Sequence, residues 1–341
     1  MTIKKISLYF ISTLVLAFVC CSGNAFAMTI TPVRYEVKGD PGETIVKEMT
    51  IINEDDVSVT YYSSFANFEA QGETGSASFV EPTDDIGTWM TTNESVTLTP
   101  GEQKSVTFTI NIPKNAEPGG HFGIIFWGTS PDTNSDGKQL AVSAKTGLLV
   151  LLSVSGEVKE GGGLLDFSTL NKKFWYNSLP VSFVYRFQND GGDRIKPAGF
   201  IKIRSFGFIP GKKLNANPVN GNILPSSTRK FTVDWVKYTE PEDFVEPTNF
   251  INSFFSKARY QWKNFAVGLY SANLDLTYGI QEKNVKGSLF FFVFPWQLLI
   301  CLIIILIIVF FIGKTIIKRY NRYIIKMAHS AMKIPEEANH V

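Results

Sequence analysis

The stretch that decides the fold reads Lys-Ser-Val-Thr-Phe-Thr-Ile-Asn-Ile at residues 104–112. Its apolar side chains alternate with polar ones, which is the period of a strand with one buried face. Residues 121–127 and 148–154 are continuous apolar runs of strand length. Turn signals such as Pro100-Gly101 separate these runs at intervals typical of a β-sandwich. Residues 28–288 are therefore predicted to be all-β.

Three landmarks occur twice along the chain in one order, which indicates a repeated unit. Each copy has an apolar strand ending in an asparagine and an acid. A proline follows, with one basic and two apolar residues at offsets of four, six and eight, and a Gly-x-aromatic triplet then opens another strand. The landmarks begin at Asn53, Pro100 and Gly120 in the first copy and at Asn189, Pro225 and Gly268 in the second.

The repeat predicts two tandem Ig-like β-sandwich domains, residues 28–160 and 161–288, joined at the flexible triplet Gly161-Gly162-Gly163. The first is acidic, with 8 Lys+Arg against 19 Asp+Glu, and the second is basic, with 17 against 10. Such a reversal can steer partners or orient the molecule above an anionic surface. Solubility and attraction between the two domains explain it equally well.

Both ends of the chain carry membrane signals. Residues 1–27 have two lysines, a short apolar run and the ending Ala25-Phe26-Ala27, which predict a cleaved signal peptide, with an uncleaved anchor as the alternative. Residues 289–312 carry no charge and are long enough to predict a transmembrane helix. The segment 313–341 is predicted to be a basic cytoplasmic tail on the anionic inner leaflet, with the bulk of the protein extracellular or periplasmic.

The residue inventory argues against catalysis. Residues 28–288 contain no cysteine, which indicates a bacterial cell surface, since a eukaryotic ectodomain of this size would usually carry disulfides. His121 is the one histidine there, so a nucleophilic triad could form only around it. Residues 132–137 match the opening half of an EF-hand loop, but Ser143 occupies the twelfth position, so a polar hairpin loop is favoured. We predict no enzyme activity, no cofactor, no metal and no nucleic-acid partner.

Two aromatic segments and the 132–137 loop are the candidate partner contacts. Residues 247–262 have apolar side chains at the helical period, which predicts a membrane-surface helix, a partner-docking helix or, as the favoured reading, a helix that crosses between strands. The candidate contact side chains in the two segments are Phe122, Phe126, Trp127, Phe250, Phe254, Phe255 and Trp262.

Turn motifs in both copies resemble those of a known family, the WxL-interacting cell-wall proteins, which pair two β-sandwich domains with a C-terminal anchor and a basic tail. The matching motifs are Pro41-Gly42, Thr99-Pro100-Gly101, Ile112-Pro113, Gly119-Gly120-His121-Phe122-Gly123, Asn189-Asp190-Gly191-Gly192, Lys196-Pro197-Ala198-Gly199 and Leu224-Pro225-Ser226. Periplasmic pilus chaperones and fibronectin-like domains share many of them. The resemblance implies contact with peptidoglycan and with other surface proteins, and it transfers no catalytic residue.

The sequence thus predicts a noncatalytic, single-pass surface protein that binds a cell-wall polymer or other exported proteins through sandwich edges and end loops. The alternative is a membrane-held chaperone or assembly factor for exported or pilus-like subunits.

Overall fold

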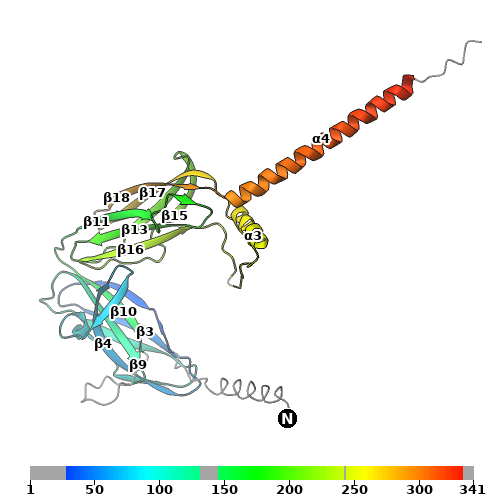
Figure 1. The fold of residues 1–341 in the computed structure, drawn as a ribbon. Coiled ribbons are helices and arrows are strands. Elements are labelled where there is room, and N and C mark those ends of the chain that lie inside the picture. Colours follow the sequence, from blue (N-terminus) through cyan, green and yellow to red (C-terminus); the bar gives the residue numbers. More distant parts are fainter. Residues whose placement is uncertain (1–27, 131–144, 242, 333–341) are drawn as a thin grey trace, which may run out of the picture. The chain divides into compact units, whose positions relative to one another are not determined.

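The computed structural model describes residues 28–130, 145–241 and 243–332. The predicted signal peptide, the loop 132–137 and the end of the tail lie outside these ranges. The chain divides into two units, of which unit 1 comprises Met1–Gly162, Asn189–Ile195 and Ile223–Thr228, and unit 2 comprises Gly163–Gln188, Lys196–Asn222 and Arg229–Val341. Figure 1 shows the strands of both units and the long C-terminal helix.

Unit 1 is built from two sheets with the orders β1-β3-β8-β6 and β2-β10-β9-β4-β5, where β7 also pairs with β4. A one-turn helix, α2 (Ile86–Trp89), precedes β6. The strands are β1 (Met28–Thr31), β2 (Arg34–Gly39), β3 (Thr44–Asn53), β4 (Val59–Gln71), β5 (Ser76–Val80), β6 (Met90–Thr92), β7 (Ser95–Leu98), β8 (Gln103–Asn111), β9 (Gly119–Gly128) and β10 (Lys145–Val154).

The hydrophobic core of unit 1 takes side chains from both of its sheets. In β8, Val106, Phe108 and Ile110 are at most 3% exposed, which confirms the strand that the alternating residues predict. They join Trp127 of β9 and Val150 of β10 in one cluster. Full burial of each such side chain contributes about 1.5–3 kcal/mol, so this pairing of apolar faces is the main stabilising term for the unit.

Unit 2 also contains two sheets, with the orders β11-β13-β16 and β12-β18-β17-β14-β15. A helix, α3 (Phe250–Lys263), lies between β16 and β17 in the chain, and the last helix, α4 (Trp296–Met332), follows β18. The strands are β11 (Gly162–Thr169), β12 (Trp175–Tyr176), β13 (Val181–Asn189), β14 (Ala198–Ser205), β15 (Ile209–Asn215), β16 (Ser227–Trp235), β17 (Gly268–Tyr278) and β18 (Lys283–Val293).

The two halves follow one strand plan. Each begins with a strand in the smaller sheet, then sends the next strand across to pair in parallel with the last strand of the larger sheet. The remaining strands of the larger sheets, β10-β9-β4-β5 and β18-β17-β14-β15, correspond one to one. The plans differ in the parallel strand, which has six residues in β2 and two in β12.

A buried asparagine closes the same loop in both copies. Asn53 ends β3, and its Nδ2 donates to the carbonyls of Val57 (2.9 Å) and Leu98 (3.1 Å). Asn189 ends β13, and its Nδ2 donates to the carbonyls of Asp193 (2.8 Å) and Ile223 (2.9 Å). The second acceptor precedes the landmark proline by two residues in each copy. The Asn-acid landmark therefore marks a site where one amide satisfies the carbonyls of two chain segments.

The apolar C-terminal segment is one helix, but it begins later than the sequence predicts. Residues 289–293 were assigned to the span and instead complete β18, where Phe291 and Val293 are buried and Phe290 is exposed. An uncharged run cannot by itself separate a strand from a helix. Helix α4 starts after Pro295 and continues through the basic residues of the predicted tail to Met332.

Helix α4 is long and apolar enough to cross a membrane, and it is the one such helix among the described residues. Its 37 residues correspond to about 56 Å, compared with a hydrocarbon core of about 30 Å. The helix therefore extends past the apolar stretch on its basic side. The chain is mainly β-sheet with one apolar C-terminal helix that could anchor it in a membrane.

We expect Asn53→Ala to lower the free energy of unfolding by roughly 1–3 kcal/mol, because it leaves the Leu98 carbonyl and its neighbours without their donor. Asn53 is completely buried and also accepts a hydrogen bond from the Tyr61 hydroxyl at 2.9 Å. Calorimetry of the detergent-solubilised full chain measures the change. Asn93→Ala, at an exposed position, is the matched control; an equal shift for both variants would contradict the assigned role.

Candidate binding surfaces

The last strand of the larger sheet is covered very differently in the two halves. In the first, β2 pairs in parallel with β10 from Leu149 to Val154. In the second, β12 pairs with only Phe292 and Val293 of β18. Within the described residues, the nine residues of β18 from Lys283 to Phe291 pair with β17 on one side and with no strand on the other. We call this row of backbone groups the open edge of β18.

The hydrogen bonds next to the open edge show which backbone groups face it. The amides of Phe292 and Phe294 donate to the carbonyls of Phe174 (2.7 Å) and Tyr176 (2.8 Å), on the β12 side. Because backbone groups alternate sides along a strand, the N–H groups of Ser288 and Lys286 point the same way. They are free to donate to an added strand without breaking the pairing with β17.

Side chains around the open edge are partly apolar. Leu164 and Phe167 of β11 are only half-buried beside Gly287, where an added Cβ would meet both at 3.1 Å. Phe290 is 58% exposed on the outer face of the strand. From Gly287 to Phe291 the edge carries no charged side chain. Charged residues commonly protect exposed edges from other chains, so this part of β18 lacks that protection.

Strand β16, which pairs only with β13, is the longest of the other edge strands in the described part of unit 2, which also include β11 and β15. Its outward side chains include Lys230 and Asp234, both exposed. The longest uncharged stretch of β16 is 231–233, compared with 287–293 in β18, so β16 is a poorer acceptor for an extended apolar segment. Of these two edges, the open edge of β18 is the better candidate.

The predicted contact residues in the first half are mostly interior. Trp127 is completely buried in the core and Phe122 is 8% exposed, packed with Phe68 and Leu151. Phe126 is half-buried, with its ring 5.1 Å from that of Phe79. The side chains of Trp127 and Phe122 are thus not presented to a partner, because β9 is a central strand flanked by β10 and β4.

The aromatic segment of the second half forms α3, close to the bounds that the periodicity predicts. Asn249 caps it, accepting a hydrogen bond from the Ile251 amide at 3.0 Å. Phe250, Phe255 and Trp262 are 83%, 59% and 66% exposed. Phe254 instead packs on Trp296 at the start of α4, with ring centres 5.9 Å apart.

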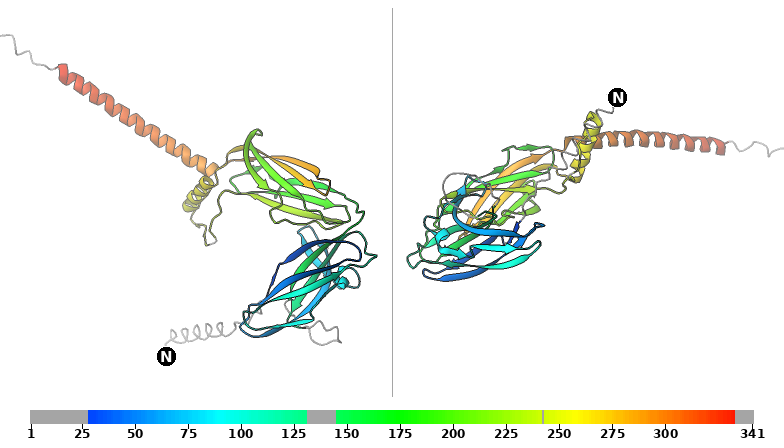
Figure 2. Two further views of the ribbon diagram at one scale, coloured as in Figure 1. Left: turned by 180° about the vertical axis from the view of Figure 1, so that it is seen from behind. Right: turned by 90° about the horizontal axis from the view of Figure 1, so that it is seen from below.

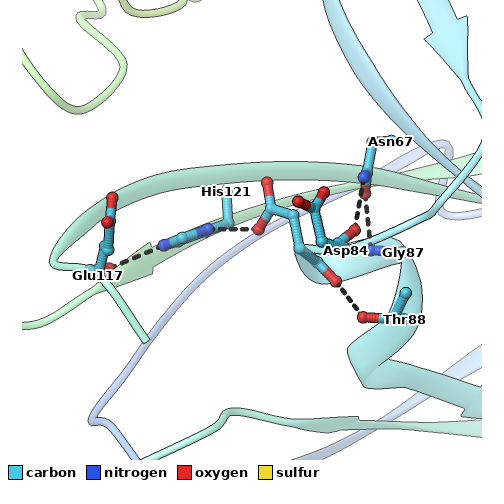
Figure 3. Close-up of polar contacts among 7 residues, drawn as sticks. Asn67, Asp84, Gly87, Thr88, Glu117 and His121 are labelled. Carbon is cyan, nitrogen blue, oxygen red and sulfur yellow. Dashed lines mark hydrogen bonds and ion pairs between the residues drawn. The ribbon is translucent and has the colours of Figure 1, made fainter. Parts of the chain in front are cut away.

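His121 belongs to a polar cluster at the start of β9, drawn in Figure 3. Its Nδ1 lies 2.5 Å from Asp85 Oδ1, and its Nε2 lies 2.8 Å from the Glu117 carbonyl oxygen. Asp85 has a φ of 63° and a ψ of −165°, a conformation that is essentially restricted to glycine and is costly for other residues. Asn67 holds the neighbouring turn through the Asp84 carbonyl (2.7 Å) and the Gly87 amide (2.8 Å).

This cluster fastens α2 onto β9 rather than exposing a reactive group. Both ring nitrogens of His121 are engaged, and its ring lies 4.7 Å from that of Trp89. Asp85 also accepts from the Thr88 amide at 2.9 Å through its backbone carbonyl. Among the described residues, no group of three or more His, Cys, Asp or Glu side chains could hold a metal ion.

No family model and no curated protein matches the chain, so membership of the WxL-interacting family stays a prediction. Among solved structures, the class 5 fimbriae chaperone CfaA is 14% identical, with 79% of this chain and 100% of that chain covered and a TM-score of 0.35. The Escherichia coli chaperone DraB is 10% identical, with coverage of 77% and 97% and a TM-score of 0.34. A protein of unknown function from Porphyromonas gingivalis W83 is 12% identical, with coverage of 77% and 99% and a TM-score of 0.26.

The His121–Asp85 contact predicts a pH-dependent stability. Burial acts to lower the pKa of His121, but hydrogen bonds to the Asp85 carboxylate and the Glu117 carbonyl outweigh it and raise this pKa above its usual 6.5. The resulting stabilisation is fully present below about 6.5 and is lost as the pH rises through the folded-state pKa. We expect His121→Gln to destabilise the protein more at about pH 5 than at about pH 8. Denaturant unfolding at both values tests this, and an equal loss at both would contradict it.

Proposed function

We propose that this chain is a noncatalytic, membrane-anchored protein of the bacterial cell surface, and that it binds other exported proteins by accepting an extended segment at the open edge of β18. Helix α4 is the anchor, and the two halves are Ig-like sandwiches. The observation that carries the proposal is the reduction of the covering strand from six residues in β2 to two in β12.

Strand addition provides affinity through backbone hydrogen bonds, and it can therefore accept partner segments of different sequence. Backbone hydrogen bonds from Lys286 and Ser288 would hold a partner strand whatever its side chains, and the half-buried Leu164 and Phe167 offer apolar contact for alternate residues. An assembly factor for exported subunits could use this edge in the same way, by strand addition. The glycan strands of a cell-wall polymer have no row of peptide N–H and C=O groups that could pair with β18. We therefore favour a protein partner.

The absence of catalysis is part of the proposal. His121 would be the only histidine base available between residues 28 and 288. Its Nδ1 is bonded to Asp85 at the start of α2, and its Nε2 is bonded to the Glu117 carbonyl. A general base needs an accessible ring nitrogen within hydrogen-bond reach of its substrate. Substitution of His121 is therefore expected to change stability and to leave partner binding intact.

The orientation of the anchor follows from the charge beyond it. Lys314, Lys318 and Arg319 begin a basic row on the last turns of α4, and such clusters remain on the cytoplasmic side. Both β-rich units then lie outside the cytoplasm. We expect protease added to intact cells, or to spheroplasts where an outer membrane blocks access, to digest residues 28–293 and to spare a fragment containing α4. Protection of the β-rich part until the cells are lysed would contradict this orientation.

A proline at position 288 tests the open edge directly. We expect Ser288→Pro to abolish partner binding, because it removes an edge N–H while leaving the pairing with β17 in place. Ser288→Ala keeps that N–H and should bind normally. The measurement is ultraviolet cross-linking in living cells from benzoylphenylalanine placed at Lys286 of the full chain.

The cross-linked products distinguish the possible partners. Adducts with exported proteins that disappear in Ser288→Pro and persist in Ser288→Ala support strand addition. Adducts that are equal in both variants contradict it. Sedimentation with purified sacculi, unchanged by Ser288→Pro, would favour a polymer partner at another surface and overturn the proposal.

A further inference from the structure

We infer that the end of unit 2 from which α4 departs is a membrane-contact surface. On it, exposed aromatic and aliphatic side chains of α3 and of the β14–β15 turn enter the headgroup region of the bilayer that α4 crosses. This inference rests on the membrane anchor of the proposed function and is independent of the open edge of β18.

Helix α3 is held against the first turn of α4 by a buried polar contact. The side chain of Gln261 donates through Nε2 to Gln297 Oε1, and its own Oε1 accepts from the Leu298 amide at 3.0 Å. Gln261 is 3% exposed and Gln297 is 7% exposed. The glutamine on α3 thus satisfies one of the unpaired amides at the start of α4. Both views in Figure 2 place α3, in yellow, beside the start of α4.

The exposed apolar residues of α3 form a stripe next to its α4-facing side. At about 100° per residue, Ile251, Phe255 and Trp262 lie within about 40° of one another around the helix. They are 60%, 59% and 66% exposed. Arg259 and Lys263 lie about 60° and 100° from the centre of this stripe, on the side away from α4. An aromatic stripe with flanking cationic residues is the pattern of a helix that lies in a membrane interface.

The β14–β15 turn brings further aromatic side chains to the same end of the unit. Phe206 and Phe208 are 58% and 74% exposed. The Phe206 amide donates to the Leu269 carbonyl at 2.7 Å, and Leu269 pairs with Phe292, four residues before α4 begins. Phe206 has a φ of 51°, an unfavourable conformation for a bulky residue. The turn therefore adopts an unfavourable backbone conformation at Phe206 and exposes two aromatic rings. Burial of these rings in an apolar phase would be favourable.

Continuity with α4 identifies that phase as lipid. Trp296, at the first position of α4, is 39% exposed, and Phe294 just before it is 44% exposed. Tryptophan and other aromatic side chains concentrate where a transmembrane helix passes through the headgroup layer. The stripe on α3 and the turn share this end of the unit with the start of α4. One bilayer can cover all three, whereas a protein partner would have to fit between the unit and its own anchor.

Site-directed spin labelling tests the surface in the full chain. The background carries Cys20→Ala, Cys21→Ala and Cys301→Ala. The probes are nitroxides at Phe255→Cys on the stripe and at Lys257→Cys, an exposed residue about 160° from Phe255 around the same helix. The chain is reconstituted in liposomes of phosphatidylcholine and phosphatidylglycerol. We expect the label at 255 to be severalfold more accessible to oxygen than to a water-soluble nickel chelate, and the label at 257 to show the reverse ratio.

Two results would overturn the inference. Ready access of the nickel chelate to both labels would mean that the stripe faces water. A label at 255 shielded from both oxygen and nickel chelate would mean that protein covers the stripe, which in this preparation is a second copy of the chain. Phe208→Cys provides an independent probe, since its label should follow the behaviour of position 255 without altering α3.

A label in α4 separates failure of this inference from failure of the anchor. Ile304→Cys lies within the apolar part of α4 and should be strongly oxygen-accessible if the helix crosses the bilayer. If position 304 reports lipid while 255 and 208 report water, the membrane-contact surface is wrong and the anchor stands. If 304 also reports water, the anchor of the proposed function fails and this inference fails with it.

Discussion

The need of every backbone N–H and C=O for a hydrogen-bond partner is the constraint on which this structure depends. Two stretches far apart in the sequence meet it with the same device, in which Asn53 and Asn189 each bind the carbonyls of their own loop and of a distant one. Gln261 meets it at the start of α4 with a side-chain oxygen. Along β18 the same groups remain without a strand partner among the described residues, which makes this edge the place where another chain can contribute.

A common strand plan makes the difference between the halves informative. In a protein with only one such domain, a two-residue strand such as β12 would have no longer equivalent for comparison. In the first half, β2 covers six residues of the equivalent strand. The short β12 is therefore a difference at one position of a strand order that the two halves otherwise share. Leu164 and Phe167 beside this edge are only half-buried. The edge therefore leaves apolar surface exposed as well as backbone groups without a strand partner among the described residues.

Period-two alternation was sufficient to predict β8, and the repeated landmarks lie at corresponding points of the strand order in the two halves. The same reasoning failed at residues 289–293 because an uncharged run has no period to read. Pro295 was the available signal, since a proline is favoured at or before the first turn of a helix. The burial of Trp127 could not be predicted from the sequence for another reason: the strand order that buries β9 between β10 and β4 depends on pairings far apart in sequence.

The open edge of β18 could not be read from the sequence at all, because an absent neighbour leaves no residue pattern. Its position along the strand nevertheless has a consequence. The short β12 covers the end of β18 next to α4, so the open residues run away from the anchor over about 30 Å. If the aromatic surface around α3 lies in the headgroup layer, a segment bound along β18 begins just beyond it. The partner would then be held at a fixed distance from the membrane by the length of one strand, with no linker required.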